Sequence, residues 1–200
     1  MLITFKGMPE PADRAKMDAA YRLRHDVFVD ELGWENLRSR DRREVDQFDN
    51  AETIHFLLFD DEEIVGYQRL VPTTGPYLMS EIYPQLCEGD LPRDRSIFEW
   101  SRLAIKHEWR GINSMGGPTL EMVRTMVEWC LRHDVRTVLV ATTPSMMLKF
   151  VQCHFRVEPL GLLQQLGGQD VIALAAHLDR RTLLRLDHLL ALRVPLNKSA

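Results

Sequence analysis

The feature that most constrains how this chain folds is an alternation of short strand-like runs with helical segments. Residues 53–59 and 64–71 are rich in β-branched and aromatic side chains and are separated by four acidic residues, a pattern typical of a β-hairpin. Comparable runs predict four more strands, at residues 2–5, 97–105, 135–142 and 171–177.

Helix signals lie between these runs. Pro11 and Asp13 open a segment whose apolar residues recur at helical spacing, and Gly33 is expected to end it. Residues 34–50 and 72–95 lack such periodicity and are expected to be mostly loop, with one helical turn in the second. Three further helices are predicted to begin at Pro118, at Pro144 and after a capping Asp179.

This order of elements predicts an α+β fold. One mixed sheet flanked by helices, with α/β/α layers, would bury the apolar faces of all the segments in a single domain over residues 1–200. The leucine-rich helix at the C-terminal end is expected to dock on that sheet.

Composition argues against several other classes. No apolar run approaches the ~18 residues needed to span a bilayer, and residues 1–14 lack the apolar core of a signal peptide, which predicts a cytoplasmic protein without a membrane partner. The net charge of −4, with both signs mixed along the chain, gives no reason to expect nucleic acid as a partner. The three cysteines and seven histidines show no ligand spacing, so neither a metal site nor a disulfide framework is expected.

Two of the strand-like runs carry charges that a buried strand does not tolerate without partners. Arg69 lies in the second run of the hairpin, and Glu99 and Arg102 lie in the run at residues 97–105. Burying an unpaired charge is costly, whereas hydrogen-bonded charges that neutralise one another are tolerated. The sequence therefore predicts a buried polar cluster that includes these three side chains.

Two further stretches carry residue types that suit such a cluster. In YRLRHDVFVDELGW, residues 21–34, Arg24 and Phe28 share one helical face, and Trp34 follows the end of the helix. In REVDQFDN, residues 43–50, Asp46 and Asp49 lie three apart in a loop. Taken alone, each stretch has a plain explanation, namely an arginine lying along apolar surface or carboxylates in solvent.

Together these stretches resemble the acyl-homoserine lactone (autoinducer) synthase family. The resemblance covers roughly residues 1–165 and rests on agreement in type, order and spacing at Arg24, Phe28, Trp34, Asp46, Asp49, Arg69, Glu99 and Arg102. It implies an acetyltransferase-like fold, in which two central strands splay apart and the pantetheine arm of a thioester pairs with an exposed strand edge. It also implies an acyltransferase of quorum sensing that uses S-adenosylmethionine and an acyl thioester as substrates, with no cofactor and no metal.

Local contexts narrow the resemblance. VDQFDN, RLVPTTGP and the Pro-Gln-Leu at residues 84–86 resemble a rhizobial and photosynthetic-bacterial branch, which includes users of CoA thioesters of branched-chain or aryl acids. Three places depart from it: Tyr83 replaces a phenylalanine, His154-Phe155 replaces Gly-Trp, and residues 141–143 differ. Because that last region lines the acyl pocket in the family, the acyl group stays open.

The resemblance implies two chemical steps. The amine of S-adenosylmethionine attacks the thioester carbonyl, and the methionyl carboxylate then displaces the sulfonium, giving the lactone and methylthioadenosine. The α-ammonium is mostly protonated at neutral pH, so the first step needs a base. Glu99 is the leading candidate, because a carboxyl group inside a strand is expected to have a raised pKa. The alternative role for Glu99 is purely electrostatic, as a partner of Arg24.

The resemblance places Arg24, Asp46 and Arg102 in the catalytic set with Glu99, and the other matched residues suit the charges of this substrate. Asp46 and Asp49 are placed to serve the sulfonium and ammonium, and Phe28 and Trp34 offer aromatic faces to the adenine and the sulfonium. By the same resemblance, Arg69 and Arg102 either hold the substrate carboxylate or lock the aspartates in place. The remaining expected substrate-binding residues are Tyr83, Ser101, Leu103, Ala104, Thr142 and Thr143, with backbone N–H groups near Leu103 and Ala104 meeting the oxyanion.

Glu99 and Arg102 raise a geometric question. In a regular strand their side chains would project to opposite faces, because side chains alternate along a strand. For both to serve one site, the strand needs an extra residue that is left unpaired. We therefore predict a β-bulge between Glu99 and Leu103.

The acyl donor and the activity have open alternatives. Acyl-CoA is the favoured donor, whereas an acyl-carrier protein would need a basic patch on this protein. The four arginines at positions 38, 40, 42 and 43 either form such a patch or belong to a loop that is simply solvated. The loop at residues 109–117, WRGINSMGG, is either a plain turn or a phosphate-binding loop before a helix. The competing functions are an N-acyltransferase of the same fold that acts on another amine, and a non-catalytic binding module.

Overall fold

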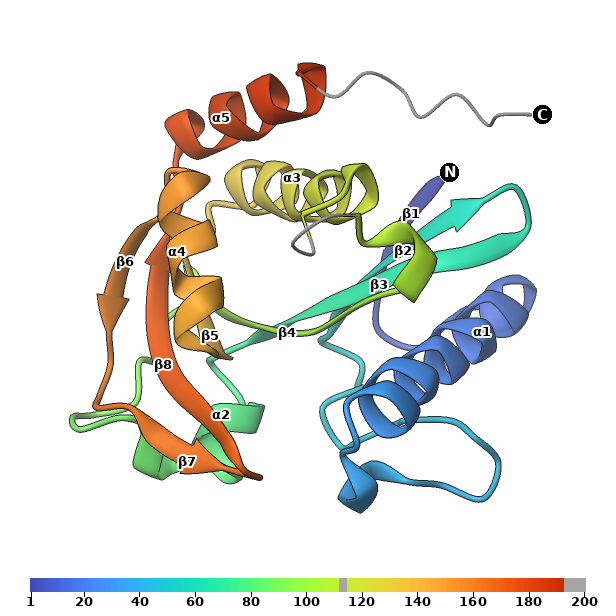
Figure 1. Ribbon diagram of the computed structural model, residues 1–200, viewed down its shortest axis with the longest axis horizontal. Coiled ribbons are helices and arrows are strands. Elements are labelled where there is room, and N and C mark those ends of the chain that lie inside the picture. The colour runs from blue at the N-terminus through green and yellow to red at the C-terminus, as the bar shows by residue number, and fades with distance from the viewer. Residues whose placement is uncertain (112–114, 193–200) are drawn as a thin grey trace.

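One mixed sheet runs through the whole molecule (Figure 1). The structure is a computed structural model that describes residues 1–111 and 115–192. The strands are β1 (Leu2–Lys6), β2 (Ile54–Asp60), β3 (Glu63–Pro72), β4 (Ile97–Ile105), β5 (Thr137–Thr142), β6 (Arg156–Pro159), β7 (Gln164–Leu166) and β8 (Gln169–His177). They are ordered β1-β2-β3-β4-β5-β8-β6, with β7 pairing β8, and among the described strands β4 and β5 form the one parallel pair.

Helices cover both faces of the sheet. They are α1 (Arg14–His25), α2 (Leu78–Glu81), α3 (Gly117–Arg132), α4 (Pro144–Gln152) and α5 (Arg180–Ala191). α1 packs against β3 and β4 on one face, and α3 packs against β2 and β3 on the other (Figure 1). α5 lies on α3 rather than on the sheet, which corrects the expectation that it docks on the sheet directly. None of the described helices is long and apolar enough to cross a membrane.

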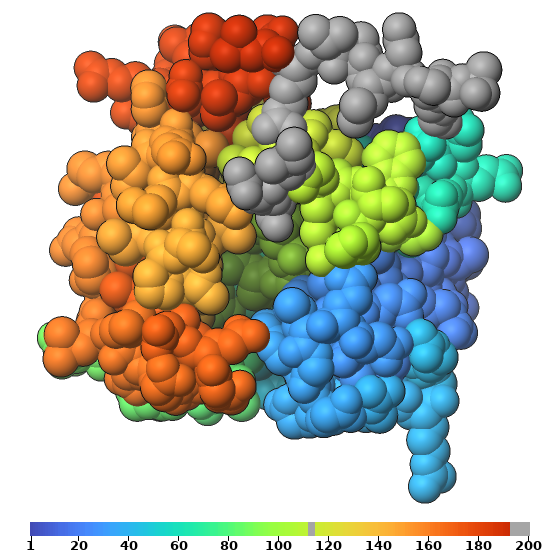
Figure 2. All heavy atoms as spheres, viewed as in Figure 1, coloured from blue at the N-terminus to red at the C-terminus, as the bar shows by residue number. Residues whose placement is uncertain are grey.

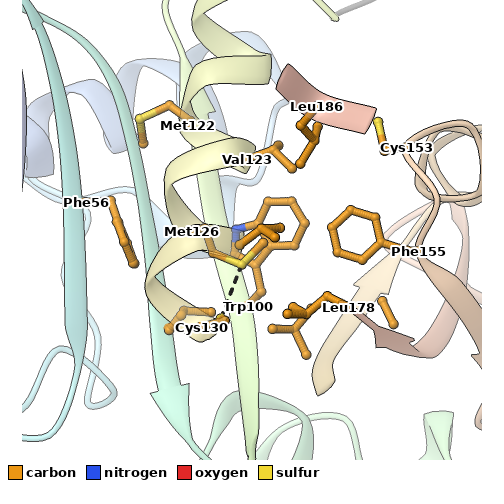
Figure 3. Close-up of a cluster of buried hydrophobic side chains, with 14 of the residues drawn as sticks. Phe56, Trp100, Met122, Val123, Met126, Cys130, Cys153, Phe155, Leu178 and Leu186 are labelled. Atoms are coloured by element: carbon orange, nitrogen blue, oxygen red, sulfur yellow. Dashed lines mark hydrogen bonds between the residues drawn. The ribbon is translucent and has the colours of Figure 1, made fainter. Parts of the chain in front are cut away.

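The larger hydrophobic core lies between α3 and the sheet. Met122 and Met126 of α3 pack there with Trp100 of β4, Phe155 and Leu186 (Figure 3). Burying side chains of this size stabilises a fold by roughly 1.5–3 kcal/mol each. A second, smaller core joins α1 to β2 and β3 on the opposite face. The sheet therefore separates two packed layers that meet different parts of the functional site.

The six strands and four longer helices that the sequence predicts are all present, so the predicted α+β fold is confirmed. The first helix continues past His25 as a π-helical segment, Asp26–Glu31, and the chain turns at Gly33 with φ of 71°. β6 and β7 are missing from the prediction because they are four and three residues long and show no apolar alternation. Residues 72–95 hold two helical turns rather than one, α2 and the 3₁₀ turn Pro84–Leu86.

The two central strands splay apart, as the resemblance implies. β4 and β5 pair only at their first residues, with Ile97 opposite Thr137 and Glu99 opposite Leu139. Beyond Glu99 the described residues of β4 form no ladder with β5, so the facing edges of the two strands are left without strand partners. Backbone groups at such an edge require other hydrogen-bond partners.

Candidate active site

A cavity of about 230 Å³ opens where β4 and β5 separate. Figure 2 shows a hollow in this part of the surface, bounded by α4 and by the segment that follows β4. One wall of the cavity contains Phe28, Trp34, Ser101 and Arg102. The opposite wall is mostly apolar and includes Trp100, Val123, Met146, Phe150 and Phe155. The cavity thus joins a polar surface on one side to an apolar surface on the other.

A β-bulge in β4 turns the polar residues toward one face, as predicted. Tyr67 pairs with Ala104, but Arg69 pairs with Ser101, so two residues of β4 oppose the single residue Gln68. Arg102 occupies the bulge with φ of 57°, a conformation that side chains other than glycine rarely adopt. Arg102 therefore reaches the Asp46 carboxylate, which also binds Arg69, on the face that Ser101 shares.

Six charged side chains from α1, the loop after it, β3 and β4 close a ring beside the cavity. Each arginine bonds two carboxylates and each carboxylate bonds two arginines, so opposite charges alternate and balance. The N–O distances lie between 2.5 and 3.0 Å. In order around this charge ring, the members are Arg24, Asp49, Arg69, Asp46, Arg102 and Glu44.

The charge ring is buried unevenly. The side chains of Arg24, Asp49 and Arg69 are fully buried, whereas those of Arg102 and Asp46 are 7% and 12% exposed. Arg102 also lines the cavity. The buried members of the ring are out of reach of a ligand, so their role is to stabilise the fold. Arg102 and Asp46 form the edge of the ring that a ligand in the cavity could contact.

Neighbouring guanidiniums keep both aspartates of the ring ionised. Burial alone would raise the pKa of Asp49, but Arg24 and Arg69 lower this pKa by more than burial raises it, so it lies well below the usual range. The pKa of Asp46 is also lowered, because the opposing effect of burial is outweighed by Arg69 and Arg102. Both groups are therefore carboxylates at neutral pH.

A second layer of polar groups lies behind the ring. The Tyr67 hydroxyl is 2.8 Å from Nδ1 of His55 and accepts a long hydrogen bond from Arg24, at 3.4 Å. Burial lowers the pKa of His55 to about 4, so this imidazole is neutral at physiological pH. Because the His55 imidazole is neutral, it does not add a fourth positive charge to the three arginines of the charge ring.

Glu44 is the member of the ring that the sequence prediction missed. It is 2% exposed and bonds both Arg24 and Arg102. A signal for it was present in the balance of charges, because three buried arginines require a third carboxylate beside Asp46 and Asp49. The prediction named Glu99 as an alternative partner of Arg24 instead.

Glu99 lies in a different environment from the one predicted. Its carboxylate accepts hydrogen bonds from the backbone N–H groups of Leu78 and Met79, at 2.9 and 2.7 Å, at the start of α2. Among the described residues, Arg24 bonds Glu44, Asp49 and Tyr67, so the alternative in which Glu99 pairs with Arg24 is wrong. Burial raises the pKa of Glu99, although these N–H groups and the nearby arginines oppose the shift, and the expectation of a raised pKa is confirmed.

Phe28 and Trp34 form the aromatic part of the cavity. Phe28 lies in the π-helical segment after α1, a type of irregularity that is frequent at functional sites. The two rings stack with centroids 5.2 Å apart and planes 14° apart, and the Arg102 guanidinium lies 5.6 Å from the Phe28 centroid. The structure thus brings both aromatic residues to the exposed edge of the charge ring.

The other predicted site residues divide into two groups. Ser101, Leu103 and Thr142 line the cavity. Ala104 is fully buried in the α1-side core, and Tyr83 packs half-buried beside the 3₁₀ turn after α2. Thr143 occupies the N-cap position of α4 without a side-chain capping bond, and its hydroxyl lies 3.0 Å from that of Ser145. Those last three side chains do not line the described cavity.

The arginines of residues 38–43 do not form a simple basic patch. Arg38, Arg42 and Arg43 each bond two acidic side chains on the surface. The two partners of Arg42 are Asp26 and Asp30, both at 2.7 Å. Those two carboxylates and His25 are the one described group with metal-like spacing, and the guanidiniums of Arg42 and Arg38 already bond the carboxylates.

The predicted phosphate-binding loop is described only in part, because residues 112–114 lie outside the described residues. On its flanks, the Gly116 N–H donates to the Arg110 carbonyl at 2.6 Å, and Gly116 is the N-cap of α3. A Cβ on Gly116 would lie 2.5 Å from that carbonyl oxygen, so this close approach requires glycine.

The splayed sheet and the cavity in its gap define an acetyltransferase-like fold. A solved N-acetyltransferase from Lactobacillus plantarum shares it, with a TM-score of 0.60 at 20% identity over 90% of this chain and 98% of that chain. Residues 10–183 match the family model described as "Autoinducer synthase". The chain therefore belongs to the autoinducer synthase family.

Individual members of the family are also similar to this chain. The isovaleryl-homoserine lactone synthase of Bradyrhizobium diazoefficiens is 34% identical over 84% of this chain and 75% of that protein. An acyl-homoserine-lactone synthase of Pseudomonas aeruginosa is 27% identical over 88% of this chain and 89% of that protein. The solved structure of BjaI, a CoA-dependent acyl-homoserine lactone synthase with SAM and isopentyl-CoA, has a TM-score of 0.89 at 31% identity and covers 97% of this chain and 90% of that chain.

Proposed function

We propose that this protein transfers the acyl group of an acyl-CoA to the amine of S-adenosylmethionine and forms an N-acyl-homoserine lactone, releasing methylthioadenosine. The observation that carries the proposal is the charge ring lying beside a cavity whose opposite wall is apolar. The similarity to an isovaleryl-homoserine lactone synthase supports the same pair of substrates and a branched-chain acyl group.

The exposed edge of the charge ring suits S-adenosylmethionine. That substrate carries an ammonium, a sulfonium and a carboxylate, so it needs both signs of charge in one place. Asp46 offers a carboxylate to its cations, and Arg102 offers guanidinium N–H groups to its carboxylate. Phe28 and Trp34 supply aromatic faces beside them for the sulfonium and the adenine.

The apolar wall suits the acyl end of the thioester. Pockets that bury whole drug-sized ligands hold roughly 300–1,000 Å³. The cavity of about 230 Å³ is smaller, so it fits a short branched or aryl acyl group rather than a complete CoA. The pantetheine arm would lie along the β4 edge that β5 leaves unpaired.

CoA is the donor that the surface charges favour over a carrier protein. An acyl-carrier protein is acidic and needs a basic surface, but Arg38, Arg42 and Arg43 are engaged by acidic neighbours. The proposal therefore commits to a CoA thioester and keeps the carrier protein as a test condition.

The proposed reaction begins with a proton. Glu99 takes one proton from the substrate ammonium through a bridging water, because Glu99 itself does not line the described cavity. The amine then attacks the thioester carbon, and backbone N–H groups of the β4 edge near Leu103 and Ala104 stabilise the oxyanion. The C–S bond breaks, and the second amine proton leaves with CoA as its thiol.

Lactone closure needs positioning more than acid–base catalysis. The methionyl carboxylate attacks the carbon next to the sulfonium, and the electron pair of the breaking C–S bond leaves on methylthioadenosine. Arg102 would hold the carboxylate near this carbon until the amide has formed. Thr142, Thr143 and Tyr83 stay predictions as substrate contacts.

The test is to incubate the purified protein with S-adenosylmethionine and a panel of acyl-CoA and acyl-carrier-protein thioesters, and to analyse the products by mass spectrometry. The proposal predicts equal amounts of lactone, methylthioadenosine and free CoA, with short branched or aryl acyl-CoA preferred. Free thiol with an acylated amine but no methylthioadenosine would indicate an N-acyltransferase. Binding without turnover would indicate a non-catalytic module, and either result would contradict the proposal.

The role of Glu99 has its own test. Glu99→Gln removes the base while keeping its shape, and the expected kcat is roughly 10²–10⁴-fold lower. Glu62→Gln, in the exposed hairpin turn, is the matched control and should leave kcat unchanged. A Glu99→Gln variant that is folded and retains wild-type kcat would remove Glu99 from the proton pathway.

A further inference from the structure

Gln68 is a fully buried polar side chain that the proposed chemistry does not use. It lies on β3 opposite the β4 bulge, and its side chain points into the α3-side layer rather than toward the charge ring. Burying an amide is costly unless its donor and acceptor atoms are bonded. An amide retained in an otherwise apolar layer therefore needs a structural reason.

Both ends of the Gln68 amide are engaged by specific partners. Its Nε2 donates to the carbonyl of Met122 in α3 at 2.6 Å, and its Oε1 accepts from Nε1 of Trp100 at 3.0 Å. The indole N–H is only a donor and the helix carbonyl is only an acceptor, so the amide has one orientation that satisfies both. The orientation of Gln68 is thus fixed, and it fixes Trp100 relative to α3.

Trp100 belongs to the apolar wall of the cavity. Its ring meets Phe150 edge to face, with centroids 5.5 Å apart, and Phe150 meets Phe155 in the same way at 5.3 Å. All three rings line the cavity, and Figure 3 shows Trp100 between α3 and Phe155. The position of the Trp100 ring therefore sets where the next two rings can lie.

We propose that Gln68 is a positioning residue for acyl selectivity, because it holds Trp100 in the orientation that closes the acyl end of the cavity. This inference rests on the proposed function. Gln68 does not line the cavity, so it acts through the Trp100 N–H rather than through the substrate. Losing that bond frees the indole to turn, and the cavity then admits longer acyl groups.

The experiment compares kcat/KM for isovaleryl-CoA and octanoyl-CoA in the wild-type protein, Gln68→Met, Trp100→Phe and the double variant. Methionine keeps the length of glutamine but makes neither bond, and phenylalanine keeps a ring but lacks the N–H. We expect the isovaleryl-to-octanoyl ratio to fall about tenfold in each single variant, with KM for S-adenosylmethionine unchanged. Because both changes remove the same bond, the double variant should match Trp100→Phe within about twofold.

Trp129→Phe is the matched control, since Trp129 packs against Phe56 and Phe98 outside the cavity. Its ratio should equal that of the wild type. An unchanged ratio in Gln68→Met, or effects of the two single variants that multiply in the double variant, would overturn the inference. If Gln68→Met does not fold, Trp100→Phe with Gln68 intact must still lower the ratio. A wild-type protein that forms no lactone from any acyl-CoA would reject the proposed function first, and with it this inference.

Discussion

The two walls of the cavity are built on different principles. The polar wall belongs to a closed ring in which every charge has two partners at fixed distances, so the loss of any member leaves a buried charge uncompensated. The apolar wall consists of rings and methionines held by packing and by one buried amide, which tolerates substitution of similar volume. The difference indicates that one wall maintains the chemistry while the other can vary with the acyl group.

Asp49→Asn tests the interdependence of the charge ring most severely. Asp49 bonds Arg24 and Arg69, both at 2.8 Å, and its loss leaves two buried guanidiniums short of a carboxylate. We expect the free energy of unfolding to fall by about 3–5 kcal/mol, measured by urea denaturation at pH 7. A loss below about 1 kcal/mol would show that the ring is not interdependent.

The same variant should change the acid sensitivity of the fold. The pKa of Asp49 is lowered in the folded state, so its contribution is complete above the unfolded value near 4 and is lost as the pH falls toward the folded value. Asp49→Asn should therefore flatten the decline of stability below about pH 4.

His55 gives a pH window that is separate from that of the ring. Its pKa is lowered from 6.5 to about 4, so between these values the unfolded chain binds a proton that the folded protein does not. Stability should fall as the pH drops through this window, by about 3 kcal/mol in total. His55→Asn should remove that slope in urea denaturation curves at pH 4–7, and an unchanged slope would contradict the buried, neutral assignment.

Met146→Ala tests the tolerance of the apolar wall. Met146 is half-buried on α4 and lines the cavity, so shortening it enlarges the acyl end while leaving the main core intact. We expect a several-fold shift of kcat/KM toward longer acyl-CoA with a stability loss of about 1 kcal/mol or less. A large loss of stability without a change in acyl preference would contradict the distinction between the walls.

Glu35→Gln provides the baseline for charge changes. Glu35 bonds Arg38 at 2.7 Å on the exposed surface, where an ion pair contributes little. We expect no measurable change in the urea midpoint or in kcat/KM. A measurable loss would mean that the loop carrying Glu44, Asp46 and Asp49 is held by its surface pairs as well.

The fold was largely predictable from the sequence, because strand and helix patterns alternate along it. The polar wall was largely predictable because charges inside apolar strands must be compensated. Arg69 and Arg102 revealed the cluster, and the need for Glu99 and Arg102 to serve one site predicted the bulge, which the pairing register of β3 with β4 and the positive φ of Arg102 confirm. The balance of charges called for a third carboxylate, but Glu44 was missed because a loop carboxylate has no periodic signature that would single it out. Its place became visible only when the loop was folded over β4.

The apolar wall was not predictable for a physical reason. Gln68 and Trp100 are 32 residues apart, and nothing in strand periodicity states that their side chains meet behind α3. The short polar strands β6 and β7 likewise depend on pairing with β8 rather than on their own pattern. Contacts of this kind are set by tertiary packing, whereas a charged residue inside an apolar strand can be recognised from the local sequence.

The most direct measurement is a comparison of the two KM values in Asp46→Asn and Trp100→Phe, determined for S-adenosylmethionine and for isovaleryl-CoA under identical conditions. If the two walls bind different substrates, Asp46→Asn should raise KM for S-adenosylmethionine at least tenfold and leave KM for isovaleryl-CoA within twofold. Trp100→Phe should show the reverse pattern. If both variants raise both KM values equally, or if each affects the substrate assigned to the opposite wall, the division of the cavity is wrong.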